Sequence, residues 1–404
     1  MQIYSLVTLL SLSTIHELTN RSQLLKKIIM QVHRLESNVD ATTSKINRFW
    51  RYFYKVYGLQ ISDDYVTKTG KCHFAFFTIS QILINALMTS LLAFFVVTDN
   101  SITNICGLIS VFTYWIQSSV CLIVLYKRQN QFFNCLNQLL QNITADKKKR
   151  AWKFLLRIMF VSIVVIVIGC IGELTYDFTE LIEYDYLRYA SKFITVYYWF
   201  AVILNETSKV LFIFVCILLS YNIECLMIDM ERNMMSFRFC TEKIVINYHY
   251  KFYRNIYLIN EVNKLFDLVL AAWIAGDVIL ICVVLRYIIA NQILASFSSI
   301  YLMRVITFLL AMYTYGSLVK EKAHAAAIAI TKLTDSQVNY YDTQVFNFRS
   351  QKKVNNWNCH LFMYDLSLSS VGINVSGYFI MSKGSILALV GTLITYVVII
   401  LQTN

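Results

Sequence analysis

The sequence predicts an all-α membrane protein with seven transmembrane helices, and two features of its composition support this. Of its 404 residues, 57% are hydrophobic and only 15% are charged, and the mean hydropathy is +0.54. Soluble domains contain about 45–50% apolar and about 25% charged residues. The chain also contains no proline. Because kinked and broken helices usually contain Pro or Gly, we expect long, uninterrupted helices.

Seven stretches of the chain are apolar over the roughly 20 residues needed to cross a bilayer. They are Phe74–Val97, Thr103–Leu125, Phe154–Leu174, Ile194–Leu219, Leu268–Ala290, Phe297–Val319 and Gly384–Gln402. The fourth contains the polar run NETSK at residues 205–209, which predicts a longer helix whose polar middle faces protein or water. An earlier apolar run, Ile3–Ile15, is too short to span and lacks the features of a signal peptide. We interpret it as an amphipathic or poorly ordered segment.

Lysine and arginine gather on one side of these spans. Residues 1–73 and the segments after the second, fourth and sixth spans are rich in both, whereas residues 98–102 and 291–296 contain neither. Residues 175–193 contain two basic and four acidic side chains. Because cytoplasmic loops collect Lys and Arg, we expect a cytoplasmic N-terminus and an extracellular C-terminus. A G-protein-coupled receptor has the reverse arrangement.

The spans divide the chain into four predicted regions. Residues 1–73 form a cytoplasmic N-terminal segment and residues 74–319 a six-helix transmembrane bundle with its loops. Residues 320–383 form a cytoplasmic anchor region and residues 384–404 the last helix. Apolar residues at helical spacing flank the fifth and sixth spans on the basic side, at Leu258, Val262, Leu265, Phe266, Ala323, Ala326, Ala327 and Ile330. We therefore expect these helices to continue beyond the membrane on the cytoplasmic side.

The last span ends in a distinctive pattern: Thr395, Tyr396, five apolar residues and Gln402. On a seven-span chain with a cytoplasmic N-terminus, this pattern resembles the insect gustatory receptors, in which T-Y and five hydrophobic residues precede Q-F. Thr403 stands where that family has Phe. Upstream, the stretch GYF at residues 377–379 is similar to the family's G-x-F before its last span.

Two further stretches are similar to that family: YRNIYLINEVN at residues 253–263 and YKVYGL at residues 54–59. The resemblance implies a tastant-gated, non-selective cation channel, permeable to monovalent and divalent cations. It implies a homo- or hetero-tetramer with other gustatory receptors, held in the lipid of the plasma membrane of chemosensory neurons. It also implies that the last helix of each subunit lines a central pore. The small-molecule tastant would bind in the outer half of each subunit's own six-helix bundle.

Helical spacing agrees with a pore role for the last span. Thr395, Ile399, Gln402 and Thr403 follow at i, i+4, i+7 and i+8 and so form one stripe. Amide oxygens can replace part of a cation's water shell, and an aliphatic constriction can gate by dewetting. The alternative is that Gln402 merely reaches headgroup water at a helix end. The resemblance favours the pore, with Tyr396 pointing off the stripe toward neighbouring helices.

Charged side chains inside the spans are costly and usually face protein or a cavity. They are Arg157, Glu173, Glu206, Lys209, Asp277, Arg286 and Arg304. Aromatic walls with a few polar groups suit small molecules. The candidate ligand-binding residues are therefore Trp115, Gln117, Tyr198, Glu206, Trp273 and Asp277. The alternative is a structural role as ion pairs and core aromatics, with Glu206 and Lys209 paired across one helical turn.

Other function classes lack their signatures. The six histidines and ten cysteines show no metal-ligand or catalytic spacing, and the sequence contains no P-loop, dinucleotide or G-x-S-x-G motif. The net charge of +12 follows from the basic loops, without a nucleic-acid-binding motif. We therefore expect no enzyme, no cofactor or metal, and no nucleic-acid partner. A G-protein-coupled chemoreceptor is the main alternative, and a transporter with broken-helix repeats is a weaker one.

Overall fold

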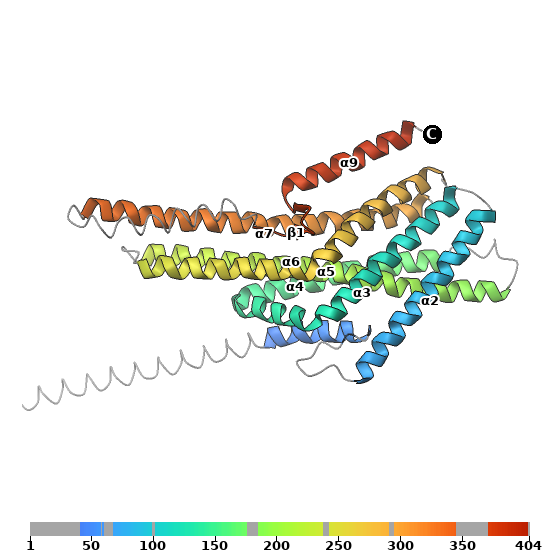
Figure 1. The fold of residues 1–404 in the computed structure, drawn as a ribbon, viewed down its shortest axis with the longest axis horizontal. Helices are drawn as coiled ribbons and strands as arrows, with labels where there is room; N and C mark the ends of the chain where they lie inside the picture. Colours follow the sequence, from blue (N-terminus) through green and yellow to red (C-terminus); the bar gives the residue numbers. More distant parts are fainter. Residues whose placement is uncertain are drawn as a thin grey trace, which may run out of the picture.

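The computed structural model describes residues 41–57, 59, 68–98, 102–175, 185–236, 242–290, 295–344 and 371–402. Its long helices are α2 (Lys68–Thr98), α3 (Ile102–Gln141), α4 (Ala145–Thr175), α5 (Asp185–Ser236), α6 (Glu242–Ala290), α7 (Ala295–Gln344) and α9 (Lys383–Gln402). A shorter helix covers residues 41–55. The strands β1 (Asn374–Val375) and β2 (Phe379–Ile380) pair antiparallel just before α9. Figure 1 shows α5, α6 and α7 running along the long axis, with α2 and α3 crossing one end.

The seven predicted spans coincide with these helices, one span in each. In the described residues, five stretches are long and apolar enough to cross a membrane, one in each of α3 to α7. The described apolar stretches of α2 and α9 are shorter, Phe74–Leu83 and Lys383–Ile399. The helical fold with membrane-capable helices is therefore confirmed. The count of seven crossings and the orientation of the two ends stay predictions.

Three helices are far longer than a bilayer requires. α5, α6 and α7 contain 52, 49 and 50 residues. At 1.5 Å per residue each measures about 75 Å, against about 30 Å of hydrocarbon. α6 and α7 are continuous through the flanking apolar residues singled out in the sequence. Predicted features at Ile3–Ile15, in residues 177–183 and in residues 345–370 lie outside the described residues.

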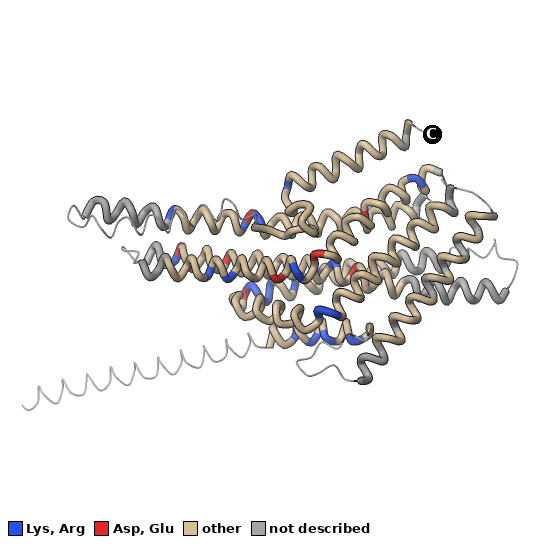
Figure 2. Tube along the Cα trace, viewed as in Figure 1, with Lys and Arg blue, Asp and Glu red and all other residues tan. Residues whose placement is uncertain are grey.

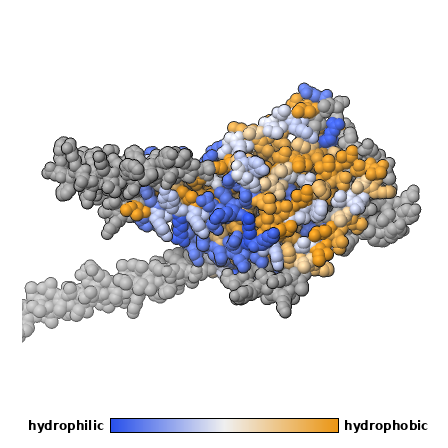
Figure 3. Space-filling view, in the orientation of Figure 1, coloured by the Kyte–Doolittle hydropathy of each residue, from blue (hydrophilic) through white to orange (hydrophobic). Residues whose placement is uncertain are grey.

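α5 is the central helix of the bundle. It packs against α2, α3, α4, α6 and α7. Every residue from 204 to 220 is buried, which is the behaviour of a helix that is enclosed on all sides. α4 lies at the periphery and exposes apolar side chains such as Phe160 and Val161. On the opposite, near face, Figure 3 shows an apolar surface (orange) at the end of the molecule where α2 lies, beside a hydrophilic region (blue).

The helix of residues 41–55 belongs to the folded core. Ile46, Trp50 and Tyr54, four residues apart, are each 0% exposed. The Trp50 ring stacks on Tyr54 with centroids 5.9 Å apart and lies 6.2 Å from Phe214 of α5. The helix therefore uses one face for packing and leaves its other face to solvent or membrane.

We predict that Trp50→Ala destabilises the protein by about 3–5 kcal/mol, because it removes a fully buried ring from this contact. Tyr52→Ala, on the exposed face of the same helix at 67% exposure, is the matched control and should change stability by less than about 0.5 kcal/mol. Thermal unfolding of the detergent-solubilised chain, followed by size-exclusion fluorescence, measures both. Equal melting temperatures for the two variants would show that this helix is not part of the core.

Candidate functional site

A charged cluster lies buried where α5 meets α6. Lys209 Nζ of α5 donates hydrogen bonds to both carboxylate oxygens of Asp277 on α6, at 2.7 and 2.9 Å. Glu206, one turn before Lys209, has its Oε1 3.6 Å from the same ammonium. All three side chains are 0% exposed. Two carboxylates facing one ammonium leave the cluster with an excess of one negative charge when all three are ionised.

A relay of amide groups connects this ion pair to α3. Gln117 Nε2 donates to Asp277 Oδ1 and to the Trp273 carbonyl, each at 3.1 Å. Asn205 Nδ2 donates to Gln117 Oε1 at 3.0 Å, and Trp273 Nε1 donates to Asn205 Oδ1 at 2.6 Å. A Cβ at Gly276 would lie 2.2 Å from Gln117 Nε2. The glycine is therefore what lets the Gln117 amide reach the backbone and carboxylate of α6.

Local spacing explains how the helices present these groups. Asn205 and Lys209 are four residues apart on α5, and Trp273 and Asp277 are four residues apart on α6. Residues at that spacing lie on one face of a helix, one turn apart. The two faces meet, so that the amide bonds the indole and the ammonium bonds the carboxylate. The polar run of the fourth span thus faces protein.

Glu206 differs from its neighbours in the cluster. Neither of its carboxylate oxygens has a hydrogen-bond partner among the described residues, although the side chain is 0% exposed. Its contact with Lys209 is a 3.6 Å ion pair, whereas the ammonium makes its hydrogen bonds to Asp277. The pairing of Glu206 with Lys209 predicted from sequence is therefore present but secondary. Glu206 retains capacity to accept hydrogen bonds.

A second buried charge, Arg304 of α7, lies among aromatic rings. Its guanidinium carbon is 4.6 Å from the Tyr301 ring centroid, 5.6 Å from Trp199 and 5.8 Å from Tyr114. Arg304 Nη2 also donates to the Tyr114 hydroxyl at 2.8 Å. Cation–π contacts of this kind stabilise a desolvated guanidinium by about 2 kcal/mol. Sequence analysis identified the charge but not the rings, which come from three different helices.

Four of the six predicted ligand-binding residues come together in the cluster. They are Gln117, Glu206, Trp273 and Asp277. Trp115 is half-buried and its ring lies 5.5 Å from Phe112, away from the hydrogen-bonded relay. Tyr198 belongs to α5, and its side chain lies outside the described part of the chain.

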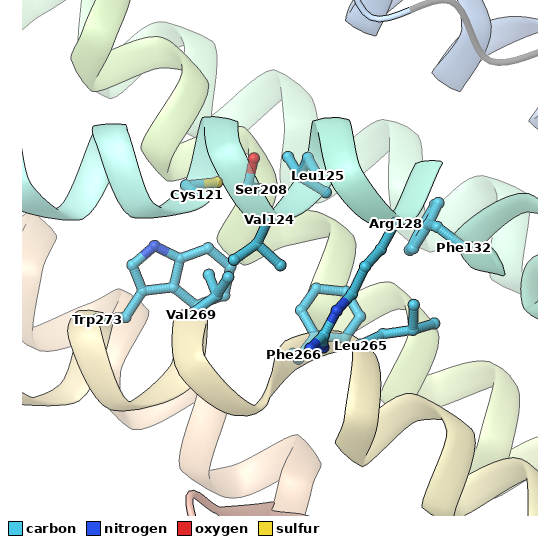
Figure 4. Close-up of a pocket in the computed structure, with 10 residues that line it drawn as sticks. All are labelled: Cys121, Val124, Leu125, Arg128, Phe132, Ser208, Leu265, Phe266, Val269 and Trp273. Carbon is cyan, nitrogen blue, oxygen red and sulfur yellow. The ribbon is translucent and has the colours of Figure 1, made fainter. Parts of the chain in front are cut away.

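A small cavity adjoins the cluster on its apolar side (Figure 4). Its volume is about 10 Å³, enough for about one water molecule. It is lined by Cys121, Val124, Leu125, Arg128, Phe132, Ser208, Leu265, Phe266, Val269 and Trp273. Ligand pockets are typically about 300–1,000 Å³. In this conformation Trp273 therefore faces a closed, close-packed region on the side away from Asn205.

The predicted pore residues occupy one side of α9. Thr395, Ile399 and Gln402 are exposed, with Ile399 at 50%, and Thr403 lies outside the described residues. Tyr396 is half-buried. The face toward the bundle carries Ile386, Leu389 and Leu393, which pack against the core. Figure 1 shows α9 standing away from α6 and α7 toward its C-terminal end.

An apolar groove separates α9 from the bundle. Its volume is about 420 Å³, and it is lined by Ile281, Leu285, Ile306, Leu309, Leu310, Leu389, Val390, Leu393, Ile394, Val397 and Val398. None of the predicted pore residues lines it. The stripe of Thr395, Ile399 and Gln402 therefore faces away from the groove, and the two sides of α9 differ in chemistry.

The β1–β2 hairpin joins α9 to the bundle. Its turn is closed by Tyr378 N donating to Val375 O at 2.9 Å, and Ser376 and Gly377 have φ of 47° and 77°. Two successive residues with positive φ are characteristic of a type I′ hairpin turn, and glycine adopts that conformation without strain. The stretch GYF at residues 377–379 thus supplies the turn and the first residue of β2.

Specific contacts dock this hairpin on α6 and α7. Asn263 of α6 donates through Nδ2 to the Gly372 carbonyl at 2.9 Å and accepts from Asn374 N at 3.1 Å. Phe379 stacks on Tyr313 of α7 with ring centroids 6.1 Å apart. A side-chain amide bonded to backbone at both of its ends fixes a strand firmly. The start of α9 is therefore tied to both helices of the pair.

This arrangement is that of a bundle of long, membrane-capable helices, and comparison with solved structures shows a protein of the same fold. The chain has the fold of the insect olfactory receptor OR5 from Machilis hrabei, with a TM-score of 0.63 and 16% identity over 89% of this chain and 100% of that one. The same receptor in complex with eugenol gives a TM-score of 0.64 and 15% identity, over 92% and 99% of the two chains. No family model matches the sequence, and no curated protein does.

We predict that Lys209→Met destabilises the protein by about 3–5 kcal/mol, because it leaves Asp277 and Glu206 buried without a cation. Adding Asp277→Leu together with Glu206→Gln should recover much of the loss, since no buried charge then remains in the cluster and an apolar pair replaces the ion pair. Thermal unfolding and surface expression measure this. Lys264→Met is the control, because Lys264 pairs with Glu261 at 73% exposure. If Lys209→Met behaves like that control, the cluster does not hold the bundle together.

Proposed function

We propose that the protein is a gustatory-type chemoreceptor: a cation channel that a small-molecule tastant opens at the plasma membrane of chemosensory neurons. One observation carries the proposal. α9 stands off the bundle and turns the polar residues Thr395 and Gln402 away from it. The T-Y and Q pattern on that helix resembles the gustatory receptors, and a protein of this fold has been solved with the small molecule eugenol.

The exposed stripe of α9 requires partners. The Thr395 hydroxyl donates to the Gly391 carbonyl of its own helix at 2.9 Å, but the Gln402 amide would be costly in lipid, because such groups usually face protein or water in a membrane. Copies of α9 around a common axis would give these groups water and cations instead of hydrocarbon. In a homo- or hetero-tetramer, Gln402 would form an amide ring and Ile399 an adjoining aliphatic ring. The first can replace a cation's water shell, and the second can close the pore by dewetting.

The hairpin supplies a route from ligand to pore. It is bonded to Asn263 on α6 and stacked on Tyr313 of α7, and α9 begins directly after it. Lys383, the first residue of α9, also pairs with Glu321 of α7 at 3.0 Å. A ligand that favours another arrangement of α6 and α7 would therefore move the start of α9. The side chains that line the groove are apolar and form no directional hydrogen bonds, so they would oppose such a shift only weakly.

Within the bundle, Glu206 is the proposed ligand contact. The polar atoms of Gln117, Trp273 and Asp277 already bond one another, Asn205 and Lys209, so we assign these three residues a supporting role. The Glu206 oxygens accept no hydrogen bond from the described residues. Hydroxyl or ammonium groups of a tastant are donors that match a carboxylate acceptor. Trp115 and Tyr198 would add aromatic surface to the site.

We predict that Ile399→Ser raises basal current in the absence of tastant, because a polar ring removes the dewetted constriction. Gln402→Ala should change relative cation permeability while leaving the half-maximal tastant concentration within about twofold. Whole-cell recording of the chain expressed alone or with other gustatory receptors measures both. Ile394→Ser is the matched control, since Ile394 is 59% exposed on the same helix but lines the groove.

Permeability and basal current that remain at wild-type values in both pore variants, with normal surface expression, would remove α9 from the pore. A response that appears only with a co-expressed G protein, together with an extracellular N-terminal tag, would instead indicate a G-protein-coupled receptor. Saturable ligand uptake without single-channel current would indicate a transporter. Each outcome is distinct from the predicted one.

We predict that Glu206→Gln raises the half-maximal tastant concentration by about tenfold, because a neutral amide is a weaker acceptor than a carboxylate. A screen of sugars and basic bitter compounds on the wild-type channel identifies the tastant used. Glu224→Gln is the control, since Glu224 is a partly exposed glutamate of the same helix that pairs with Lys147 at 3.1 Å, outside the Lys209 cluster. An unchanged dose response with normal surface expression would exclude Glu206 from the ligand site.

A further inference from the structure

A basic surface lies on the outward face of the helix of residues 41–55. Lys45, Arg48 and Lys55 are exposed there, together with the aromatic Tyr52 at 67% exposure. Residues 41–55 contain no acidic side chain. The buried face of the same helix holds it against the core, so the basic face has a fixed orientation. The helix is therefore amphipathic, with one apolar face and one cationic face.

The start of α4 extends this surface. Lys149, Arg150 and Lys153 are exposed, and the acidic group in the first turn of α4 is Asp146. The rings of Phe49 and Trp152 meet edge to face at 6.0 Å, which places the two basic segments side by side. Figure 2 shows Lys and Arg grouped where the helix of residues 41–55 lies against α3 and α4.

The position of the basic surface along the membrane axis follows from α4 itself. Past Arg157, which is also exposed, the outward side chains of α4 become apolar, with Phe160 at 70%, Val161 at 59% and Ile163 at 52%. Seven residues separate Lys153 from Phe160, a rise of about 10 Å. A helix that changes from exposed cations to exposed aliphatics over that distance crosses from headgroups into hydrocarbon.

The helix of residues 41–55 is also held in a fixed position against α3 and the core. Asn47 Nδ2 donates to Asn137 Oδ1 of α3 at 2.7 Å, on the side of the helix between its basic and buried faces. Trp50 and Tyr54 are fully buried beneath it. The cations are thus presented from a docked helix, so a headgroup that binds them need not order the backbone of that segment. One bound anionic headgroup would interact with several of these cations at the same time.

We propose that Lys45, Arg48, Lys55, Lys149, Arg150 and Lys153 form a binding surface for anionic phospholipid headgroups. Clusters of four to eight basic residues beside a membrane-spanning helix or on an amphipathic helix attract anionic lipids. The apolar side chains of α4 beyond the cluster would contact the acyl chains of the same lipid. This surface rests on the membrane placement in the proposed function, but it lies apart from both α9 and the Glu206 cluster.

The test uses the full chain in phosphatidylcholine nanodiscs, titrated with dioctanoyl phosphatidylinositol bisphosphate and dioctanoyl phosphatidylserine and followed by thermophoresis. Lys45→Gln/Arg48→Gln/Lys55→Gln should weaken binding of the bisphosphate lipid by about tenfold or more, and Lys149→Gln/Lys153→Gln should weaken it similarly. Raising the salt concentration should weaken wild-type binding, because salt screens exposed charges. Because the assay needs neither tastant nor current, it can fail independently of the channel proposal.

The matched control is Arg232→Gln/Arg254→Gln/Lys264→Gln, which removes the same charge from exposed positions on α5 and α6 that are not part of the proposed surface. It should change binding by less than about twofold. Equal loss in this control, or full binding in the first triple variant with an unchanged melting temperature, would overturn the proposal. Equally tight binding of free inositol trisphosphate would also overturn it, because the ligand would then be a soluble phosphate rather than a lipid.

Discussion

The buried pair of Lys209 and Asp277 sets a constraint that the rest of the bundle must satisfy. Two charges removed from water are stable only when their partners and hydrogen bonds are complete. Here the ammonium bonds both carboxylate oxygens, and Gln117 bonds the carboxylate from a third helix. The position of α5 between α3 and α6 follows, since only an enclosed helix can hold these groups away from lipid and water. Close approach of α3 to α6 in turn requires a glycine at position 276.

α3 to α7 pack around this centre and make few of their contacts with α9. It is anchored at its first residues through the hairpin and faces a purely apolar groove beyond them. Apolar contacts are non-directional, so they restrain the distance of α9 from α6 and α7 more than its tilt. A bundle bonded to one end of a weakly held helix is the arrangement on which the proposed gating depends. In the proposed channel, the bundle would bind the ligand and the weakly held helix would change the pore.

The membrane contributes the remaining constraint. The outer surface of α4 changes from cationic to aliphatic within about 10 Å, while the interior holds the bonded pair of Lys209 and Asp277. The surface and the interior therefore differ in the side chains that are stable there. Side chains that face lipid are stable when they are apolar, whereas charged side chains are stable in the core when they are bonded to partners. The helix of residues 41–55 belongs to both the interior and the surface, because it buries Trp50 on one face and exposes Lys45 and Arg48 on the other.

The sequence by itself determined the helices and the chemistry of their faces, because hydropathy and helical spacing are local properties. Each predicted span lies in one helix, and the stripe on α9 follows from a period of 3.6 residues. Only the tertiary structure decided which distant groups meet. Lys209 bonds Asp277, 68 positions away, in preference to Glu206, and Arg304 bonds Tyr114, 190 positions away. Such pairs depend on how each helix is rotated about its axis, which is set by packing against all its neighbours together.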